Sequence, residues 1–231
     1  PMSKLWIPKR ALGLVSEKRK LAIRWSGLLK KAVRKFNFYI MKKHLTVKQK
    51  EIESFDKMKG DFHYKNSMAA PKMVKVVLNV GTGTAIKKDK NKNDAVAERL
   101  AKITGQKSAL RGAKQSVASF KIRQGDPIGI VVTLRGKRMY AFLEKLINVA
   151  LPRTKDFRGI NPGSVDNIGN LTIGIKEHTI FPETADEDIK DVFGLSVTLV
   201  STAKNKEEGK TFFKLIGIPF KKEEDAKEKK K

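Results

Sequence analysis

The side chains that most often carry catalysis are few in this sequence and stand far apart. There is no cysteine among the 231 residues, which excludes cysteine nucleophiles, thiolate metal sites and disulfides. The three histidines, His44, His63 and His178, lack the spacing of metal ligands, and we expect each to be a surface or partly buried structural residue. Because no metal cluster or activated nucleophile is recognisable, the sequence predicts that the protein is not an enzyme and holds no metal and no cofactor.

Two short motifs look like ligand sites but have simpler interpretations. The Gly-Thr-Gly motif at residues 81–83 follows an apolar run, as a dinucleotide-binding loop would, yet Ile86 stands where such a loop needs its third glycine. We therefore expect a tight turn beside a sheet. Acidic residues cluster between positions 183 and 188, and we interpret them as a solvated loop or the start of a helix rather than as a metal site.

Excess positive charge is the strongest signal in the composition. The 50 Lys and Arg residues outnumber the 24 Asp and Glu residues, which gives a formal net charge of +26. Such a surplus repels itself unless a polyanion neutralises it, so nucleic acid is the expected partner and an anionic membrane surface is the second possibility. No apolar run approaches the roughly 20 residues that cross a bilayer, and we expect a soluble protein.

The composition changes near Thr46, where both signs of charge begin to mix. Before residue 50 the only acidic residue is Glu17. We predict three parts: a basic N-terminal extension at residues 1–45, a main domain at 46–221 and a charged tail at 222–231. A transit peptide remains an alternative for the extension, because such peptides are also basic and poor in acids. An amphipathic helix is predicted in the extension from the apolar residues Leu21, Trp25, Leu28, Ala32, Phe36 and Ile40.

The main domain mixes strand and helix patterns without strict alternation, which favours an α+β fold with a largely antiparallel sheet. Thr46 and Gln49 match a capping box, so a helix should begin there with Ile52, Phe55 and Met58 on one side. Further helices are predicted at residues 93–104, 139–147 and 205–215, the second of these three ending at Pro152. Strands are predicted at residues 73–80, 107–111, 128–134, 171–175 and 195–200, with a long loop between the second and third.

A series of motifs in the main domain matches a known family in both order and spacing. They read Ile-Thr-Gly-Gln-Lys at 103–107, Ser-Val-Ala-Ser-Phe-Lys-Ile-Arg-Gln-Gly-Asp-Pro-Ile-Gly at 116–129, Val-Thr-Leu-Arg-Gly at 132–136, Arg-Met-Tyr at 138–140, Ala-Leu-Pro-Arg at 150–153, Asp-Phe-Arg-Gly at 156–159 and Gly-Ile-Lys-Glu-His-Thr-Ile-Phe-Pro-Glu at 174–183. With weaker matches on both sides, residues 62–221 resemble the L5 family of large-subunit ribosomal proteins.

The resemblance implies a ribosomal RNA-binding domain with a concave antiparallel sheet of about five strands backed by helices. It also implies binding to 5S rRNA and its attachment to 23S rRNA in the central protuberance, in a cytoplasmic ribosome or, if the extension is a transit peptide, an organellar one. Val165 and Ile168 stand where the family usually has Phe and Arg, and Ser119 replaces a loop glycine. Contacts made by those family side chains are therefore not expected here.

The resemblance assigns one set of residues to the 5S rRNA contact. Amide and hydroxyl groups donate to and accept from 2′-hydroxyls and base edges, whereas lysine meets phosphate. Lys75 and Asn79, four residues apart in a predicted strand, should share one face of the sheet. The alternative is that Asn79 and Thr133 bond to local backbone at strand ends. The set is Lys75, Asn79, Gln106, Lys107, Thr133 and Arg135.

Two further regions have assigned contacts in the family. The long loop, with candidates Lys114, Ser116, Phe120, Lys121 and Arg123, reaches the elbow of the P-site tRNA; its basic and aromatic residues suit a nucleic-acid backbone, and the alternative is a solvated hairpin tip. The segment after the main helix, with candidates Phe157, Arg158 and Asn161, faces the small-subunit head protein S-thirteen across an intersubunit bridge, although Phe157 could equally be core.

The expected partners are thus 5S rRNA, 23S rRNA, P-site tRNA, protein S-thirteen and neighbouring large-subunit proteins, with no membrane. Two other functions remain open from the residues alone. A general RNA chaperone would use charge without discriminating between RNAs. A membrane-surface protein would use the basic amphipathic helix of the extension.

Overall fold

The computed structural model describes residues 45–83, 92–185 and 192–221. The chain divides into two units, Pro1–Leu45 and Thr46–Lys231. The helix predicted between residues 21 and 40 lies outside the described residues, as do His44, the tail at 222–231 and most of the acidic cluster. The helices and strands described below belong to the second unit.

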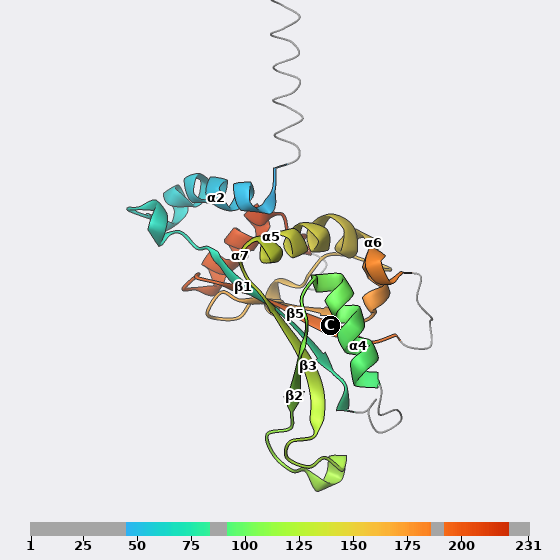
Figure 1. Ribbon diagram of the computed structural model, residues 1–231. Helices are drawn as coiled ribbons and strands as arrows, with labels where there is room; N and C mark the ends of the chain where they lie inside the picture. The colour runs from blue at the N-terminus through green and yellow to red at the C-terminus, as the bar shows by residue number, and fades with distance from the viewer. Residues whose placement is uncertain (1–44, 84–91, 186–191, 222–231) are drawn as a thin grey trace, which may run out of the picture. The chain divides into compact units, whose positions relative to one another are not determined.

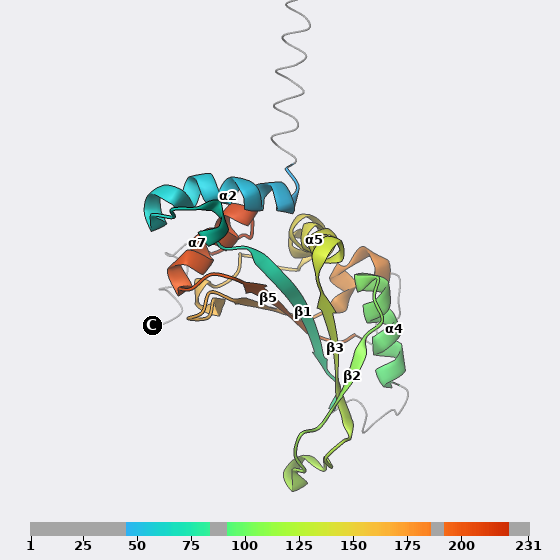
Figure 2. The same cartoon turned by 60° about the vertical axis from the view of Figure 1, so that its left-hand side comes forward.

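A five-stranded antiparallel sheet forms the centre of this unit (Figure 1). Strand β1 (Met73–Gly81) lies between β3 (Pro127–Leu134) and β5 (Leu195–Ser201). The edge strands are β2 (Ala109–Gly112), beside β3, and β4 (Leu171–Ile175), beside β5. The order β2-β3-β1-β5-β4 confirms the predicted α+β class, and the sheet bends away from the helices so that its free face is concave (Figure 2).

The helices cover one face of this sheet and build the core with it (Figures 1 and 2). The α-helices are α2 (Val47–Phe62), α4 (Lys92–Thr104), α5 (Gly136–Lys145), α6 (Leu151–Arg153) and α7 (Lys206–Ile216), and a π-helical segment at Leu146–Ala150 joins α5 to α6. Short 3-10 turns occupy Ser67–Ala69, Ala118–Phe120, Pro162–Ser164, His178–Ile180 and Pro182–Thr184. None of the helices among the described residues covers the other face of the strands (Figures 1 and 2).

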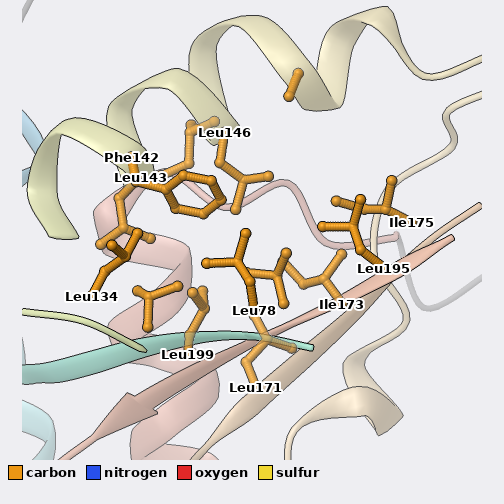
Figure 3. Close-up of a cluster of buried hydrophobic side chains, with 14 of the residues drawn as sticks. Leu78, Leu134, Phe142, Leu143, Leu146, Leu171, Ile173, Ile175, Leu195 and Leu199 are labelled. Carbon is orange, nitrogen blue, oxygen red and sulfur yellow. The ribbon is translucent and has the colours of Figure 1, made fainter. Parts of the chain in front are cut away.

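Alternation along β1 assigns its two faces. Val76, Leu78 and Val80 are buried, and Figure 3 shows Leu78 on the same side as Phe142 and Leu143 of α5. The intervening positions of β1 are half-buried or exposed. Because side chains alternate in a strand, the polar residues of β1 necessarily face away from the helices.

The capping box predicted at the start of α2 is confirmed. The Gln49 backbone N–H donates to Thr46 Oγ1 at 3.3 Å, and the Thr46 N–H donates to the Gln49 side chain at 2.9 Å. The expected apolar side is wrong at Ile52, which is 68% exposed. Met58 is buried as expected and Phe55 is half-buried, and the buried face also includes Ser54. On the same helix Glu51 accepts hydrogen bonds from the Tyr140 hydroxyl and the backbone N–H of residue 73.

The main helical segment does not stop at Pro152 but continues to Arg153. The Leu151 N–H donates to the Leu146 carbonyl, a π-type bond, so the helix widens just before the proline. Pro152 follows immediately after this π-type bond, at the start of α6. The prediction that the proline ends the helix was therefore wrong by one residue.

Candidate nucleic-acid interface

The face of the sheet that none of the described helices covers, which we call the open face, carries polar and small apolar side chains (Figure 2). On β1, β3, β4 and β5 its side chains alternate with buried residues and are half-buried or exposed, and on the edge strand β2 all four residues are exposed. The five strands contain no Asp or Glu, so nothing on their open-face side chains repels an anion. The open face comprises Lys75, Val77, Asn79, Ala109, Arg111, Val131, Thr133, Thr172, Gly174, Ser196, Thr198 and Val200.

Asn79 lies at the middle of a row that crosses all five strands. It pairs with Val131 on one side and with Ser196 on the other, and these pair in turn with Ala109 and Gly174. The Ser196 hydroxyl donates to the Asn79 backbone carbonyl at 3.3 Å. The Asn79 side-chain amide is exposed and makes no hydrogen bond with any residue that the structure describes. Its donors and acceptor are therefore available to a ligand.

A second row brings Thr133 next to these residues. Thr133 pairs with Val77, which lies between Lys75 and Asn79 in β1. Val77 pairs on its other side with Thr198, whose hydroxyl lies 3.2 Å from that of Thr172. Lys75, Asn79 and Thr133 thus share one face on adjacent strands, as the predicted alternation of β1 required.

Gln106 reaches this surface from the end of α4. Gly105, with φ of +65°, ends the helix, and the Thr104 hydroxyl donates to the carbonyls of Leu100 at 2.7 Å and Gln106 at 3.2 Å. The Gln106 side-chain amide donates to the Thr133 carbonyl at 3.2 Å. One of its two N–H donors therefore supports the fold, and the other N–H and the carbonyl oxygen remain for a ligand.

Lys107 and Arg135 occupy the ends of neighbouring strands. Lys107 is exposed and lies just before β2. A strand was predicted at 107–111, but the observed strand begins two residues later, at Ala109. Arg135 is exposed and extended, with φ of −138° and ψ of 164°, immediately after buried Leu134. The alternation of β3 therefore carries Arg135 toward the open face.

Several open-face residues were missed by sequence reasoning. Ser196 and Thr198 alternate with the apolar residues of β5, and Thr172 does the same in β4. Their alternation was a signal that half of each strand faces away from the core. Arg111, paired with Gly129 at the β2 edge, adds a cation.

The long loop between β2 and β3 is an ordered hairpin extension that projects beyond the sheet (Figure 1). A bridge joins Val117 to Ile122, and the Asp126 carboxylate accepts from the Arg123 N–H at 2.7 Å. Ser116 accepts from the Gln124 N–H at 2.9 Å, so its hydroxyl already supports the loop. The five loop candidates are all exposed: Lys114, Ser116, Phe120, Lys121 and Arg123.

The loop accommodates Ser119 without strain. Ser119 lies in the 3-10 turn Ala118–Phe120 and is not among the residues with positive φ. The left-handed position is taken by Lys121, with φ of 51°. The loss of the family's glycine therefore does not distort this loop.

Phe157, Arg158 and Asn161 line a cleft of about 800 Å³ beside β4, which we call the β4 cleft. Phe157 packs partly against the core, whereas Arg158 is exposed. Asn161 is exposed, and its side-chain oxygen accepts from the Gly163 N–H at 2.9 Å. Of the two family departures nearby, Val165 is buried in the core and Ile168 is 64% exposed.

The residues considered for catalysis or metal binding are placed apart. His178 is fully buried, contrary to the expected surface or partly buried position, because its ring stacks on Phe193 at 4.1 Å and accepts from the Phe193 N–H. His63 is exposed at the end of α2. Glu183 forms an ion pair with Lys145 at 2.6 Å. Within the described residues no group of three or more His, Cys, Asp or Glu could hold a metal ion.

Two other predicted features involve the end of β1 and the length of the helices. At the end of β1, the N–H of Thr82 donates to the Ile128 carbonyl at 2.9 Å. The start of the Gly-Thr-Gly motif thus continues the pairing with β3, and the residues that would complete a turn after Gly83 lie outside the described residues. No helix in the described part of the chain is both long and apolar enough to cross a bilayer.

Comparisons with known proteins agree on one family. Residues 66–123 match the model of "Ribosomal protein L5", and residues 127–220 match that of the "ribosomal L5P family C-terminus". The chain is 51% identical over 168 residues to the "Large ribosomal subunit protein uL5" of Trichlorobacter lovleyi, covering 73% of this chain and 93% of that protein. The proteins of the same name from Desulfatibacillum aliphaticivorans and Halothermothrix orenii are 51% and 50% identical, over 72% and 73% of this chain and 92% and 93% of theirs.

The family assignment has two supports. The two family models together match residues 66–123 and 127–220, and the chain covers more than nine tenths of the length of the relatives named above. This family is a structural, non-enzymatic component of the ribosome. The chain belongs to the ribosomal protein L5 family.

Proposed function

We propose that the protein binds 5S rRNA through the open face and links it to 23S rRNA in the central protuberance of the large ribosomal subunit. The observation that carries the proposal is the acid-free surface across five strands, with Lys75, Asn79 and Thr133 on the same face around Val77. The net charge of +26 supplies the long-range attraction that any RNA partner requires.

The chemistry of the open face suits RNA rather than an acidic protein. Adjacent strands lie about 4.8 Å apart, so the row through Asn79 spans roughly 19 Å. A shallow RNA groove presents 2′-hydroxyls and base edges over such a width, and these groups pair with amides and hydroxyls. Lys75 and Arg135 at the border of the face would meet phosphates, and so would Lys107.

The exposed hairpin between β2 and β3 supports a second contact, with P-site tRNA. Its cations and Phe120 suit a phosphate backbone and a stacked base, and it projects beyond the end of the sheet (Figure 1). Because Ser116 and the Arg123 backbone already hold the loop, the free contributors would be the side chains of Lys114, Lys121 and Arg123.

The β4 cleft supports a third contact, with protein S-thirteen of the small-subunit head. Arg158 is exposed there, and Asn161 offers an amide whose oxygen already accepts one hydrogen bond. Phe157 is partly held by the core, so it would support the cleft wall more than it contacts a partner. Neighbouring large-subunit proteins are expected to cover further surface.

The 5S rRNA proposal is tested by reversing one charge on the open face. Lys75→Glu should weaken 5S rRNA binding about tenfold or more, because a hydrogen bond to a charged group contributes roughly 1.5–3 kcal/mol. The matched control is Lys57→Glu, an exposed position on α2 that changes net charge equally. Equal loss in both variants would show that only total charge matters, as a general RNA chaperone would require.

A membrane-surface function predicts a different result. Such a protein would bind vesicles of anionic lipid at physiological salt, and Lys75→Glu would affect that binding no more than Lys57→Glu. The proposed function requires 5S rRNA binding to persist in the presence of these vesicles.

A further inference from the structure

The outer edge of β4 forms one wall of the β4 cleft. The consecutive residues 172–176 all line this cleft. Because neighbouring side chains of a strand point to opposite faces of the sheet, a cleft lined by every one of them runs along the edge of the strand. Among the described strands β4 pairs only with β5, so this edge has no neighbouring strand.

Beyond its first residue, this edge also has no partner outside the named strands. A single bridge joins Leu171 to Val165. From Thr172 to Lys176 the backbone makes no hydrogen bond with any described residue other than those of β5. Because the N–H and C=O groups of a strand alternate in direction, about half of those on these residues point away from β5. Such unpaired groups are a template for another strand.

The opposite wall of the cleft has its backbone bonded elsewhere. The Ile160 N–H donates to the Pro219 carbonyl at 2.8 Å, and the Lys221 N–H donates to the Ile160 carbonyl at 2.9 Å. Gly159 allows this close approach, because its φ is +94° and a Cβ there would lie 2.8 Å from the Lys221 nitrogen. Ile160 therefore pairs with the segment 219–221 and leaves the edge of β4 open.

The two faces of β4 give the cleft two kinds of side chain. Ile173 and Ile175 are buried on the core side, and Ile180 adds to this apolar part of the lining. Thr172 and Gly174 are exposed on the other side. A strand added at this edge would place every second side chain against the isoleucines and the others on the side of Thr172.

Cations outnumber carboxylates in the cleft. Its two acidic residues are Asp156 and Glu177. Its four cations are Lys155, Arg158, Lys176 and Lys221. The first three of these cations are exposed, and none of the four forms an ion pair with a residue that the structure describes. The charge of the cleft therefore complements an acidic ligand.

We propose that the β4 cleft binds an extended segment of a partner protein as an added strand, and that this segment alternates apolar and acidic residues. Its backbone pairs with the free edge of β4, and its apolar side chains pack against Ile173 and Ile175. Its carboxylates meet Lys176 and the cations of the opposite wall. The inference rests on the proposed use of this cleft as a protein contact and names the chemistry of the segment that it takes.

An RNA strand would use only part of this arrangement. Phosphates would meet the cations, but a phosphodiester backbone has no amide N–H groups for the unpaired carbonyls of β4. It would also leave Ile173 and Ile175 without an apolar partner. The free strand edge therefore favours a peptide.

Binding of short peptides to the full chain tests the proposal at physiological salt. The probe is a capped peptide Val-Glu-Val-Glu-Val-Glu, close to β4 in length, and two versions of it are N-methylated either at the valines or at the glutamates. An added strand uses the N–H groups of alternate residues only, so one version should bind about tenfold more weakly or worse, and the other within about threefold of the parent. All three peptides carry the same charge. Equal binding by all three, or no binding of the parent peptide, would overturn the proposal.

Amide hydrogen exchange of the full chain locates the bound peptide. A saturating amount of the parent peptide should slow exchange of the cleft-facing amides within residues 172–176 about tenfold. The control is β2, the other edge strand, where exchange should change less than about twofold. Equal protection of both edges, or of neither, would overturn the proposal.

Two matched variants test the role of the cations. Arg158→Gln/Lys176→Gln should weaken binding of the parent peptide by about three- to tenfold, because exposed ion pairs are individually weak. Lys137→Gln/Arg138→Gln removes the same charge from exposed positions on α5 and should weaken binding less than about twofold. An equal loss in both would mean that net charge alone attracts the peptide and would overturn the proposal.

Failure of this proposal is distinguishable from failure of the proposed function. Binding of 5S rRNA is measured separately with Lys75→Glu, and its loss there supports the open face whatever the peptide does. Protein S-thirteen should compete with the bound peptide. If the peptide behaves as expected and S-thirteen does not compete, the S-thirteen contact is wrong and the strand addition is supported.

Discussion

Neighbouring residues on opposite faces of β1 should separate folding from RNA binding. Leu78 is fully buried at the centre of the sheet beneath Phe142 and Leu143, and Leu78→Ala leaves a cavity that strands on both sides prevent from collapsing (Figure 3). Loss of a buried leucine costs about 2–5 kcal/mol, and we expect about 3–4 kcal/mol here. Because domains are typically stable by about 5–15 kcal/mol, the variant should remain folded at low temperature.

Asn79→Ala should produce the opposite pattern. Its side chain is exposed and has no hydrogen-bond partner in the described part of the chain, so the free energy of unfolding should change by less than about 0.5 kcal/mol. Binding to 5S rRNA should weaken by about 1–3 kcal/mol if the amide makes a well-aligned contact.

Urea unfolding and RNA competition, measured on both variants at one salt concentration, distinguish the two faces. Leu78→Ala should lower the urea midpoint with an unchanged slope and keep its preference for 5S rRNA. Asn79→Ala should keep the midpoint and lose part of the preference. If both variants lose stability together, or if Asn79→Ala weakens all RNAs in parallel, the assignment of the two faces to core and RNA is refuted.

Three further outcomes are expected for other parts of the chain. Shortening the loop within residues 113–124 should leave 5S rRNA binding intact but speed release of P-site tRNA from assembled ribosomes; unchanged tRNA off-rates would refute the loop assignment. Deleting residues 1–45 should flatten the salt dependence of RNA binding by roughly one unit of slope for each phosphate that the extension neutralises, while discrimination survives; a deletion that abolished discrimination would show that the extension itself reads RNA. Tyr140, whose pKa is raised well above its usual value by burial and by its hydrogen bond to Glu51, should contribute stability below about pH 10 that disappears as pH rises, so Tyr140→Phe should flatten the alkaline fall in unfolding free energy; an identical pH profile in the variant would count against that role.

Most helices and strands could be predicted from the sequence, because capping residues and the spacing of apolar residues involve positions only a few residues apart. The capping box at Thr46 and Gln49 depends on neighbours in sequence, and it formed as predicted. The α4 stripe of Val96, Leu100 and Ile103 was likewise readable from its spacing and is buried. The prediction for Ile52 was wrong because its exposure depends on a contact distant in sequence. The hydrogen bond from Tyr140 to Glu51 helps to orient α2, and Ile52 then faces solvent.

The site was only partly readable for the same physical reason. Alternation showed that Lys75 and Asn79 share a face, but it could not show which strands flank them. Ser196 reaches Asn79 across 117 residues of sequence, and the pairing of β5 with β1 is set by the packed sheet. The β4 cleft is formed by the segment 154–161, the end of β4 and Lys221. Because these parts are far apart in sequence, no local sequence pattern predicts the cleft.

Competition between two RNAs distinguishes specific recognition of 5S rRNA from attraction by charge alone. The full chain is bound to labelled 5S rRNA at physiological salt and challenged with unlabelled 5S rRNA or with an unrelated structured RNA of the same length. We expect the unrelated RNA to compete at least tenfold less well, because base edges and 2′-hydroxyls on the open face add to the phosphate attraction. Equal competition by the two RNAs would contradict recognition of 5S rRNA by the open face.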